Sequence, residues 1–529
     1  MLLSKGLTKR LFGNSKYPLK KPSGLNINEK GQQKQIIQTG LQNPLRQIII
    51  DEINQKQQGM TLARFMELGL LHPQHGYYSC KDQIFNKGGD FTTSPEISQM
   101  FGEMVGLWLM TALKNYQEGP ESPEIQSVEQ VQVRELNSIN IIEIGPGSGI
   151  MMSDIIRTLS QFTGNLKNIQ INLIEASNNL CLKQQDKLLK QLKDKHNMFL
   201  TYDLELHKFS KEAQTPVEKF MNTDQNFSIA WFPSLKHFYN MYLENQLKQV
   251  KEIKAKMEQL YPHEEQAKRM TARAVIENQL QNPCFVLAHE LYDALPIHQF
   301  QFSQDRKWRE KLVRYDKTLD NLDLSIEEGT LVPQYEQENI QNILKPEKLF
   351  TKEILKDIKP GDQIEVCPQA ITLTQEIISL VELSRGNALI IDYGEDHAFT
   401  NSFRGIKNHQ VVKDFKEICD NVGQIDLTSY VNFAQIKKIA QNNENLIVNG
   451  PMPQGLFLES MGINMRKEIL QKYTKTEQQR KILEESYYRL CHPQEMGEIY
   501  KMMYFGHKDV GDIYPFIGEQ TAKEQEMYG

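Results

Sequence analysis

Short runs of apolar, mostly β-branched residues recur along the chain, and each is followed by polar residues or glycine. Apolar runs of about four to eight residues between turn residues predict buried strands of a parallel sheet. The runs that carry this prediction are 139–144, 171–174, 228–232, 284–288 and 387–391. Between them, residues 151–162 and 370–383 have the spacing of helices. The pattern therefore predicts an α/β fold in which strands and helices alternate.

The same pattern divides the chain into regions. Apolar residues at mixed three- and four-residue spacing predict helix from Pro44 to about Leu71, and the many charges of 236–281 predict a solvated helical insertion to which no chemistry is assigned. The predicted regions are a leader and linker at 1–43, an N-terminal helical or lid region at 44–135, a core at 136–235 and 282–400, the insertion at 236–281, and a mainly helical, substrate-side tail at 401–529.

The first apolar run leads into a glycine-rich loop. The strand predicted at 139–144 breaks into Gly145-Pro146-Gly147-Ser148-Gly149, and a helical pattern follows. Glycines at 145, 147 and 149 allow positive φ and a close approach of a ligand to the backbone, and the helix start offers unpaired N–H groups. This favours a nucleotide-like ligand. An ordinary glycine-rich turn is the alternative, because short glycine motifs also arise without function.

The next predicted strand ends in a carboxylate, Glu175. In nucleotide-binding α/β sheets, an acid about 20 residues beyond the glycines accepts hydrogen bonds from ribose hydroxyls. Glu175 therefore strengthens the prediction of a nucleotide-like ligand.

Polar residues also follow the strands predicted at 284–288 and 387–391. His289, Glu290 and Asp293 follow the first and Asp392 follows the second. Ligands of open α/β sheets bind beyond the carboxyl ends of the strands, so these side chains are candidates for the same crevice. The alternative is that His289 is a core histidine and Asp293 a helix cap.

A polar loop precedes the core. Ser94, Pro95 and Glu96 fit an N-cap, a first-turn proline and a first-turn acid, and so predict a helix that runs through Met110. Asp90, Thr92 and Thr93 add hydrogen-bonding groups, which is how a lid over a small ligand could be built. A well-made helix start is the plainer interpretation.

Composition excludes several classes. The net charge of −6 and a pI near 6.1 give no electrostatic footprint for nucleic acid. No apolar run is long enough to predict a membrane span, and the six cysteines are scattered singly, which supports neither a metal site nor a disulfide framework.

The N-terminal segment differs from the rest. Residues 1–28 contain six Lys or Arg residues and no acid, and Leu2, Leu3, Leu7 and Leu11 can gather on one side of a helix. This is typical of a mitochondrial transit peptide and favours import into the matrix. A disordered basic arm is the alternative.

Five ordered motifs resemble one family, the MidA family. They are the stretch 89–103, the loop that starts Glu143-Ile144-Gly145, the stretch 288–296, Asp392-Tyr393-Gly394 and Phe403-Arg404-Gly405. The resemblance runs from about Pro44 to Phe505. It implies a Rossmann-like class I methyltransferase core with a mainly helical N-terminal region, insertions and C-terminal helical additions.

The resemblance also implies an activity and site residues. Members are S-adenosylmethionine-dependent protein arginine methyltransferases that assist assembly of mitochondrial complex I, so the expected reaction is symmetric dimethylation of an arginine in a core subunit. A homodimer is possible. The expected catalytic residues are Glu290, Asp293 and His289. The expected cofactor-binding residues are Ser94, Glu143, Gly145, Gly147, Gly149 and Glu175.

Three positions depart from the family pattern, and two other functions stay open. Members usually have Arg at Ser148, His at Glu395 and Asp at Asn432. A non-catalytic complex I assembly chaperone that keeps the fold is the second function. A nicotinamide-dependent oxidoreductase is the weakest, because the loop lacks the full G-x-G-x-x-G spacing.

Overall fold

The chain forms two compact units. Unit 1 comprises Met1–Thr93, Tyr292–Thr372 and Tyr393–Ile436, and unit 2 comprises Ser94–Leu291, Leu373–Asp392 and Lys437–Gly529. The computed structural model describes residues 43–80, 93–118, 134–163, 166–196, 199–201, 219–222, 226–327, 334–346 and 352–517. The predicted transit peptide and the lid residues Asp90 and Thr92 lie outside the described residues.

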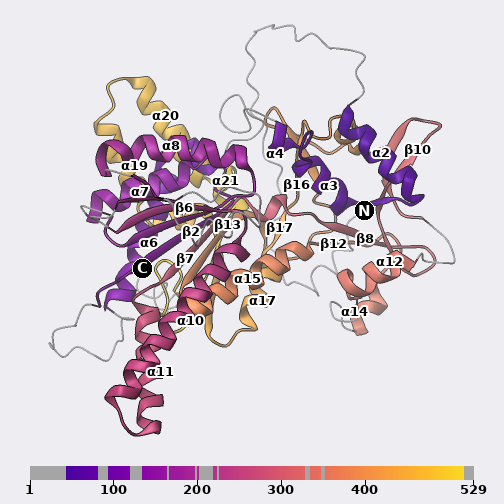
Figure 1. Cartoon of the computed structure of the whole chain (residues 1–529). Helices are drawn as coiled ribbons and strands as arrows, with labels where there is room; N and C mark the ends of the chain where they lie inside the picture. The colour runs from indigo at the N-terminus through magenta and orange to yellow at the C-terminus, as the bar shows by residue number, and fades with distance from the viewer. Residues whose placement is uncertain are drawn as a thin grey trace. The chain divides into compact units, whose positions relative to one another are not determined.

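Unit 2 is built on a mostly parallel sheet (Figure 1). Its strands follow the order β18-β19-β13-β7-β2-β3-β6-β5-β4. They are β2 Ile139–Ile144, β3 Ile169–Ile174, β4 Phe199–Thr201, β5 Lys219–Asn222, β6 Phe227–Phe232, β7 Cys284–His289, β13 Asn387–Glu395, β18 Leu446–Pro453 and β19 Tyr500–His507. The pairs β13–β7, β7–β2, β2–β3 and β3–β6 are parallel. The predicted α/β class is confirmed.

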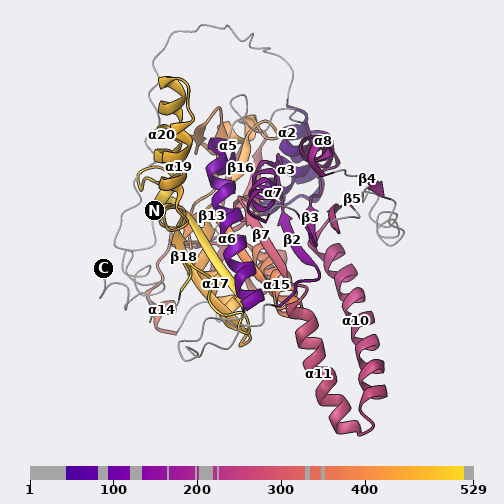
Figure 2. The ribbon, with the colours of Figure 1, turned by 90° about the vertical axis from the view of Figure 1, so that its left-hand side faces the viewer.

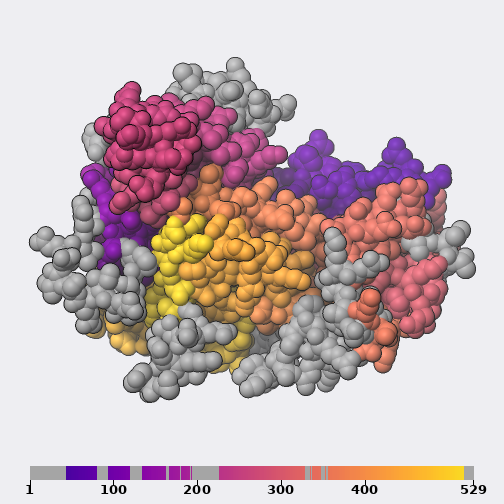
Figure 3. Space-filling model, turned by 90° about the horizontal axis from the view of Figure 1, so that it is seen from below, coloured from indigo at the N-terminus to yellow at the C-terminus, as the bar shows by residue number. Residues whose placement is uncertain are grey.

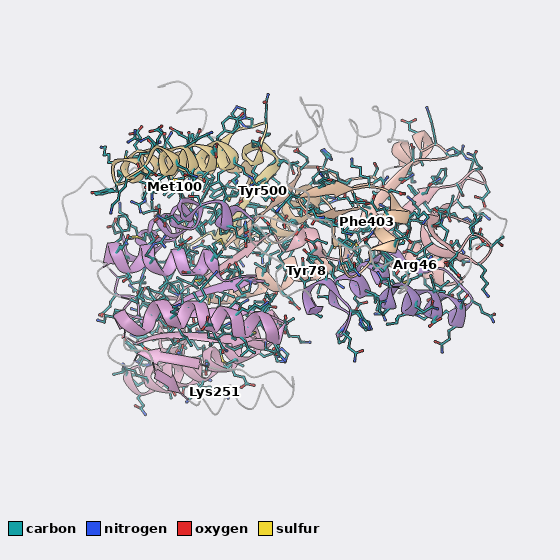
Figure 4. The ribbon with its side chains drawn as sticks, turned by 90° about the horizontal axis from the view of Figure 1, so that it is seen from above. Arg46, Tyr78, Met100, Lys251, Phe403 and Tyr500 are labelled. Atoms are coloured by element: carbon teal, nitrogen blue, oxygen red, sulfur yellow. The ribbon has the colours of Figure 1, made fainter. Side chains whose placement is uncertain are left out.

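One face of this sheet carries the main core. Alternate residues of the parallel strands, such as Ile141, Leu173 and Trp231, are buried with helices α6 Gln99–Glu118 and α7 Ile150–Thr163. Figure 4 labels Met100 of α6, which is fully buried in the same cluster. Because side chains alternate across a strand, the other face is lined by a different set of residues.

The C-terminal tail differs from the mainly helical prediction. It supplies the helices α18 Gln454–Ser460, α19 Ile463–Lys472, α20 Glu477–Cys491 and α21 Met496–Ile499. It also supplies β18 and β19, which pair antiparallel at one edge of the sheet. The apolar residues of β19, Met502 and Phe505 among them, are buried, so sheet pairing outweighs the helical tendency of the surrounding sequence.

The charged segment that follows β6 forms two long helices. α10 spans Leu235–Leu260 and α11 spans Glu264–Leu280. They lie side by side and extend past the sheet (Figure 2), and they form a raised block on the face seen in Figure 3. No helix within the described ranges is long and apolar enough to cross a bilayer.

Unit 1 contains small antiparallel sheets and short helices. The sheets have the orders β1-β10-β11, β12-β8-β9 and β15-β14-β16. Their strands are β1 Met60–Thr61, β8 His298–Phe302, β9 Trp308–Glu310, β10 Leu312–Asp316, β11 Asn321–Ser325, β12 Gln363–Val366, β14 Arg404–Lys407, β15 Gln410–Val412 and β16 Asp426–Thr428.

Two helix predictions need correction. The helix predicted from Pro44 to about Leu71 is two helices, α2 Pro44–Lys56 and α3 Leu62–Leu71, with β1 between them. The helix predicted from Ser94 through Met110 is a short turn, α5 Ser94–Ile97, followed by α6. The second helix starts afresh because the Ser98 hydroxyl accepts the Met100 N–H at 3.2 Å.

Glycines on α6 permit a close helix crossing. A Cβ atom at Gly102 would lie 2.6 Å from Cβ of Asp154 on α7, and one at Gly106 would lie 2.9 Å from Cβ of Thr158. Gly102→Ala should therefore lower the free energy of unfolding by about 1–3 kcal/mol through overpacking, although alanine favours helix. Denaturant unfolding measures this. A gain in stability would show that α6 and α7 can separate freely.

Candidate functional site

The glycine loop adopts the conformation expected from its sequence. Gly145, Gly147 and Gly149 have φ of +67°, +53° and +70°, whereas Ser148 is not among the residues with positive φ. The Gly149 N–H donates to the Pro146 carbonyl at 2.8 Å, and α7 starts at Ile150. The Arg-to-Ser departure at this position therefore introduces no backbone strain.

Glu175 follows β3 and faces the same loop. It is 9% exposed. One carboxylate oxygen accepts the Ser177 N–H at 2.8 Å and the other accepts Nε2 of Gln184 at 3.1 Å. Burial raises the pKa of Glu175 to about 7, although these hydrogen bonds oppose the shift. Each oxygen has a further lone pair that a ribose hydroxyl could use.

Gln184 connects the loop and Glu175, and sequence reasoning missed it. Its Nε2 also donates to the Gly147 carbonyl at 2.8 Å, and its Oε1 accepts Nε1 of Trp231 at 3.0 Å. A signal was present in the sequence. On α8, Asn178–His196, the buried stripe Leu180, Gln184, Leu188 has one polar member. An amide on an apolar stripe indicates a specific hydrogen-bonding role.

Replacing Gln184 by leucine should weaken cofactor binding. The Gly147 carbonyl and the Glu175 carboxylate would lose a donor, a loss of about 1–3 kcal/mol in stability, and we expect about tenfold weaker binding of S-adenosylhomocysteine. Calorimetry and denaturant unfolding measure the two effects. Gln185→Leu is the matched control, since the Gln185 side chain is buried with no hydrogen bond to any described residue. Equal behaviour of the two variants would contradict the role of Gln184.

Glu143 lies in β2, two residues before the glycine loop. It is 2% exposed, and its Oε2 has no hydrogen-bond partner among the described residues. Burial alone raises its pKa to about 8. A buried carboxylate oxygen without a donor is a suitable partner for a cationic group of a ligand.

A second cluster lies beyond β7, the strand next to β2. Ala288 pairs with Ile144, so Glu290 follows β7 beside the strand end that carries the glycine loop. The Glu290 carboxylate accepts the Ser94 N–H at 3.4 Å and lies 3.3 Å from Nε2 of His289. The Glu290 backbone has φ of +48°, an uncommon conformation for glutamate. Strained residues of this kind concentrate at functional sites.

Buried polar residues hold this cluster in place. Asp392, at the end of the neighbouring strand β13, accepts the Leu291 N–H at 3.1 Å. The Ser94 hydroxyl donates to Oε1 of Gln454 at 3.1 Å, and both residues are fully buried. Sequence reasoning missed Gln454, which lies far from the motifs along the chain. The structure thus places Ser94 next to Glu290.

Asp293 and Arg404 belong to unit 1. The Asp293 carboxylate accepts hydrogen bonds from the hydroxyls of Tyr393 and Thr428, the latter at 2.7 Å. The Arg404 guanidinium lies 3.9 Å from the ring centre of Tyr430 and 5.1 Å from that of Tyr393. Both charged groups therefore contact residues of unit 1. A catalytic role for Asp293 stays a prediction.

The two remaining departures from the family pattern are neighbours. β17 Val431–Asn432 pairs parallel with the end of β13, and Glu395 lies opposite Asn432. The Asn432 side chain accepts the Gln435 N–H at 3.1 Å at the start of α17, Phe433–Gln441. Asparagine caps a helix as well as aspartate does, so this substitution keeps the local structure.

The site in unit 2 fits a nucleoside with a cationic methionine portion. The loop glycines have positive φ, Glu175 has hydrogen-bond capacity for hydroxyls, and one buried oxygen of Glu143 has no donor among the described residues. These are the features that S-adenosylmethionine needs.

Comparisons with known proteins agree with this chemistry. Residues 104–452, more than half of the chain, match the model of a family described as "Putative S-adenosyl-L-methionine-dependent methyltransferase". The chain is 28% identical over 446 residues to the mitochondrial protein arginine methyltransferase NDUFAF7 of Bos taurus, covering 84% of this chain and 79% of that one. The chain is 29% identical over 441 residues to the Danio rerio protein of the same name, and this match covers 83% of this chain and 81% of that one.

A solved structure has a similar fold. It is a crystal structure from Burkholderia thailandensis of a methyltransferase candidate bound to S-adenosyl-homocysteine. The TM-score is 0.58 at 17% sequence identity, and the match covers 90% of this chain and 96% of the other. The similarity supports the methyltransferase fold.

Proposed function

Since this chain belongs to the MidA family of S-adenosylmethionine-dependent methyltransferases, we propose that it methylates arginine in a protein substrate. The cofactor predicted from the sequence is confirmed at the level of the family. The observation that carries the substrate proposal is Glu290, whose backbone has an uncommon positive φ and which follows β7 beside the strand end that carries the glycine loop. The names of the relatives support arginine as the acceptor.

The cofactor assignments rest on the geometry of unit 2. Gly145, Gly147 and Gly149 would surround the methionine portion, and Glu143 would accept a hydrogen bond from its ammonium group. Glu175 would bind the ribose hydroxyls, so Glu175→Ala should weaken binding. Ser94 would act from the neighbouring cluster, where its N–H orients Glu290.

The proposed mechanism uses Glu290 to orient and deprotonate the acceptor. When bound, S-adenosylmethionine supplies an electrophilic methyl group on a sulfonium. Arginine remains protonated in water, with a pKa above about 12, and is then a poor nucleophile. A carboxylate that binds the guanidinium could align it and accept its proton as the N–C bond forms, while the methyl–sulfur bond would break and the neutral thioether would leave. His289, whose Nε2 lies 3.3 Å from Glu290, would assist this carboxylate.

The finer assignments extend the resemblance. We propose symmetric dimethylation of an arginine in a core subunit of complex I in the mitochondrial matrix, with Asp293 as a further catalytic candidate. The relatives with the mitochondrial name support the location. A non-catalytic chaperone is the second candidate, and no feature of the described site favours it over catalysis.

Incubation with labelled cofactor tests the proposal. The purified protein, S-adenosylmethionine carrying a labelled methyl group and isolated complex I subunits should yield labelled protein, and mass spectrometry should place symmetric dimethylarginine in one subunit. Label on lysine or on a small molecule would refute the substrate. Cofactor binding without any transfer, combined with normal complex I assembly by the Glu290→Gln protein, would favour the chaperone.

A further inference from the structure

The second face of the central sheet carries an unusual polar row. Asn140 on β2 pairs with Gln170 on β3, and Gln170 pairs with Ser228 on β6. Asn172 follows two residues later on the same face of β3. Parallel sheets normally carry apolar residues on both faces because helices cover them. The polar row therefore needs an explanation.

Helix α10 covers this row and leaves a cavity beneath it. Phe238, Tyr242 and Gln246 recur every four residues and so lie on one side of α10. The cavity between this side and the sheet has a volume of about 210 Å³, and none of its lining residues is charged. One water needs only about 10–15 Å³, so there is room for a small molecule.

The cavity lies at the far end of the strands from the cofactor loop. Asn140, Gln170 and Ser228 are each the second residue of their strand, whereas the glycine loop and Glu175 follow the last residues of β2 and β3. The polar row cannot be part of the methyl-transfer site.

Several amide groups in the cavity have unused hydrogen-bonding capacity. Gln246 is 5% exposed, and its side chain has no hydrogen bond to any described residue. Asn172 donates to the Gln170 carbonyl at 3.2 Å, while its own side-chain oxygen accepts nothing from the described residues. In contrast, Gln170 and Ser228 bond to each other.

The lining of the cavity indicates which class of small molecule could bind there. Side-chain amides present a donor and an acceptor in one plane, the pattern that pairs with the edge of a nucleobase. Phe238 and Tyr242 supply aromatic surface, with ring centres 6.0 Å apart and planes at 23°. The lack of charge disfavours phosphates and carboxylates. The volume, below the about 300 Å³ of an ordinary ligand pocket, restricts the ligand to little more than one ring.

We propose that this cavity is a second binding site, for a small uncharged heterocycle with the hydrogen-bonding edge of a nucleobase. The ring lies between the amides of the sheet and the aromatic side of α10. Gln246 and Asn172 bind its edge. The site is independent of the proposed methyl transfer.

Binding of free pyrimidine bases tests the site, because each is a single uncharged ring. Uracil, cytosine and thymine are titrated into the full chain by calorimetry, with S-adenosylhomocysteine saturating the cofactor loop. At least one should bind, with an affinity that does not change between low and high salt because no charge is involved. Gln246→Leu and Asn172→Leu should each weaken binding by about tenfold or more. Gln259→Leu, the same change on the exposed end of α10, should leave it intact.

The outcomes separate this site from the methyltransferase. Binding that survives both cavity variants would overturn the proposal, as would an absence of binding by all three bases or preferential binding of glucose. A crystal structure grown with the base that shows only water in the cavity would overturn it as well. Glu290→Gln should bind the bases normally, so a failure of methyl transfer leaves this test unaffected.

Discussion

Replacing Glu290 by glutamine should lower the rate of methyl transfer by about 10²–10⁴-fold, the usual contribution of a general base. Glutamine keeps the shape of the side chain and an oxygen that can accept the Ser94 N–H, which donates to Glu290 at 3.4 Å. It removes the charge that would align the guanidinium and the group that would accept its proton. Cofactor affinity should change little, because the glycine loop and Glu175 are untouched.

Single-turnover transfer from labelled cofactor measures the rate, and calorimetry with S-adenosylhomocysteine measures binding. Glu258→Gln on the exposed end of α10 is the matched control and should retain full activity. Unfolding by denaturant should show equal stability for both variants. If Glu290→Gln instead lost the cofactor, the carboxylate would belong to the cofactor half of the site. Unchanged transfer would leave the reaction without its proposed base.

The sequence predicts the centre of the fold well because the chemistry there is local. An apolar strand followed by glycines specifies a sharp turn, and Gly145, Gly147 and Gly149 all have positive φ. Glu175 could be placed because its distance from the loop follows from one strand–helix–strand unit. The buried strands at 139–144 and 284–288 were likewise found from mainly apolar runs, which are typical of a sheet covered on both faces.

Predictions failed where the deciding contact joins distant parts of the chain. The break between α2 and α3 depends on β1 pairing with β10, some 250 residues away in sequence. The strands β18 and β19 form because each satisfies the other's backbone at the sheet edge. Gln454 supports Ser94 across a separation of 360 residues. No local pattern encodes such partners.

Burial was the other quantity that the sequence could not supply. Glu143 and Glu103 are both glutamates with apolar neighbours in sequence, and both are almost fully buried, at 2% and 4% exposed. Glu103 forms ion pairs with Arg157 at 3.1 Å and Arg466 at 2.8 Å, whereas one oxygen of Glu143 has no donor among the described residues. We therefore expect the two carboxylates to have opposite effects on the free energy of folding.

This contrast leads to the second prediction: Glu143→Gln should stabilise the cofactor-free protein at pH 8. The folded-state pKa of Glu143 is raised from 4.5 to about 8 by burial. The unfolded chain therefore ionises first, and the wild type loses stability as pH rises from 4.5 through 8. Glutamine mimics the protonated acid at every pH. The variant should exceed the wild type by about 1–3 kcal/mol at pH 8, with the difference vanishing near pH 4.5.

The same substitution should weaken binding of the cofactor, because it removes the negative charge of the oxygen that would bind the cofactor's ammonium group. Loss of a charged hydrogen bond of about 1.5–3 kcal/mol corresponds to roughly 10–100-fold weaker binding. Denaturant unfolding at pH 5 and pH 8, and calorimetry with S-adenosylhomocysteine, measure the two effects. Glu103→Gln is the control. It breaks a buried ion pair and should therefore lower the free energy of unfolding at both pH values. If both substitutions lower the free energy of unfolding equally, Glu143 is a structural residue. If Glu143→Gln raises it while Glu103→Gln lowers it, the unpaired carboxylate of Glu143 costs stability and serves ligand binding.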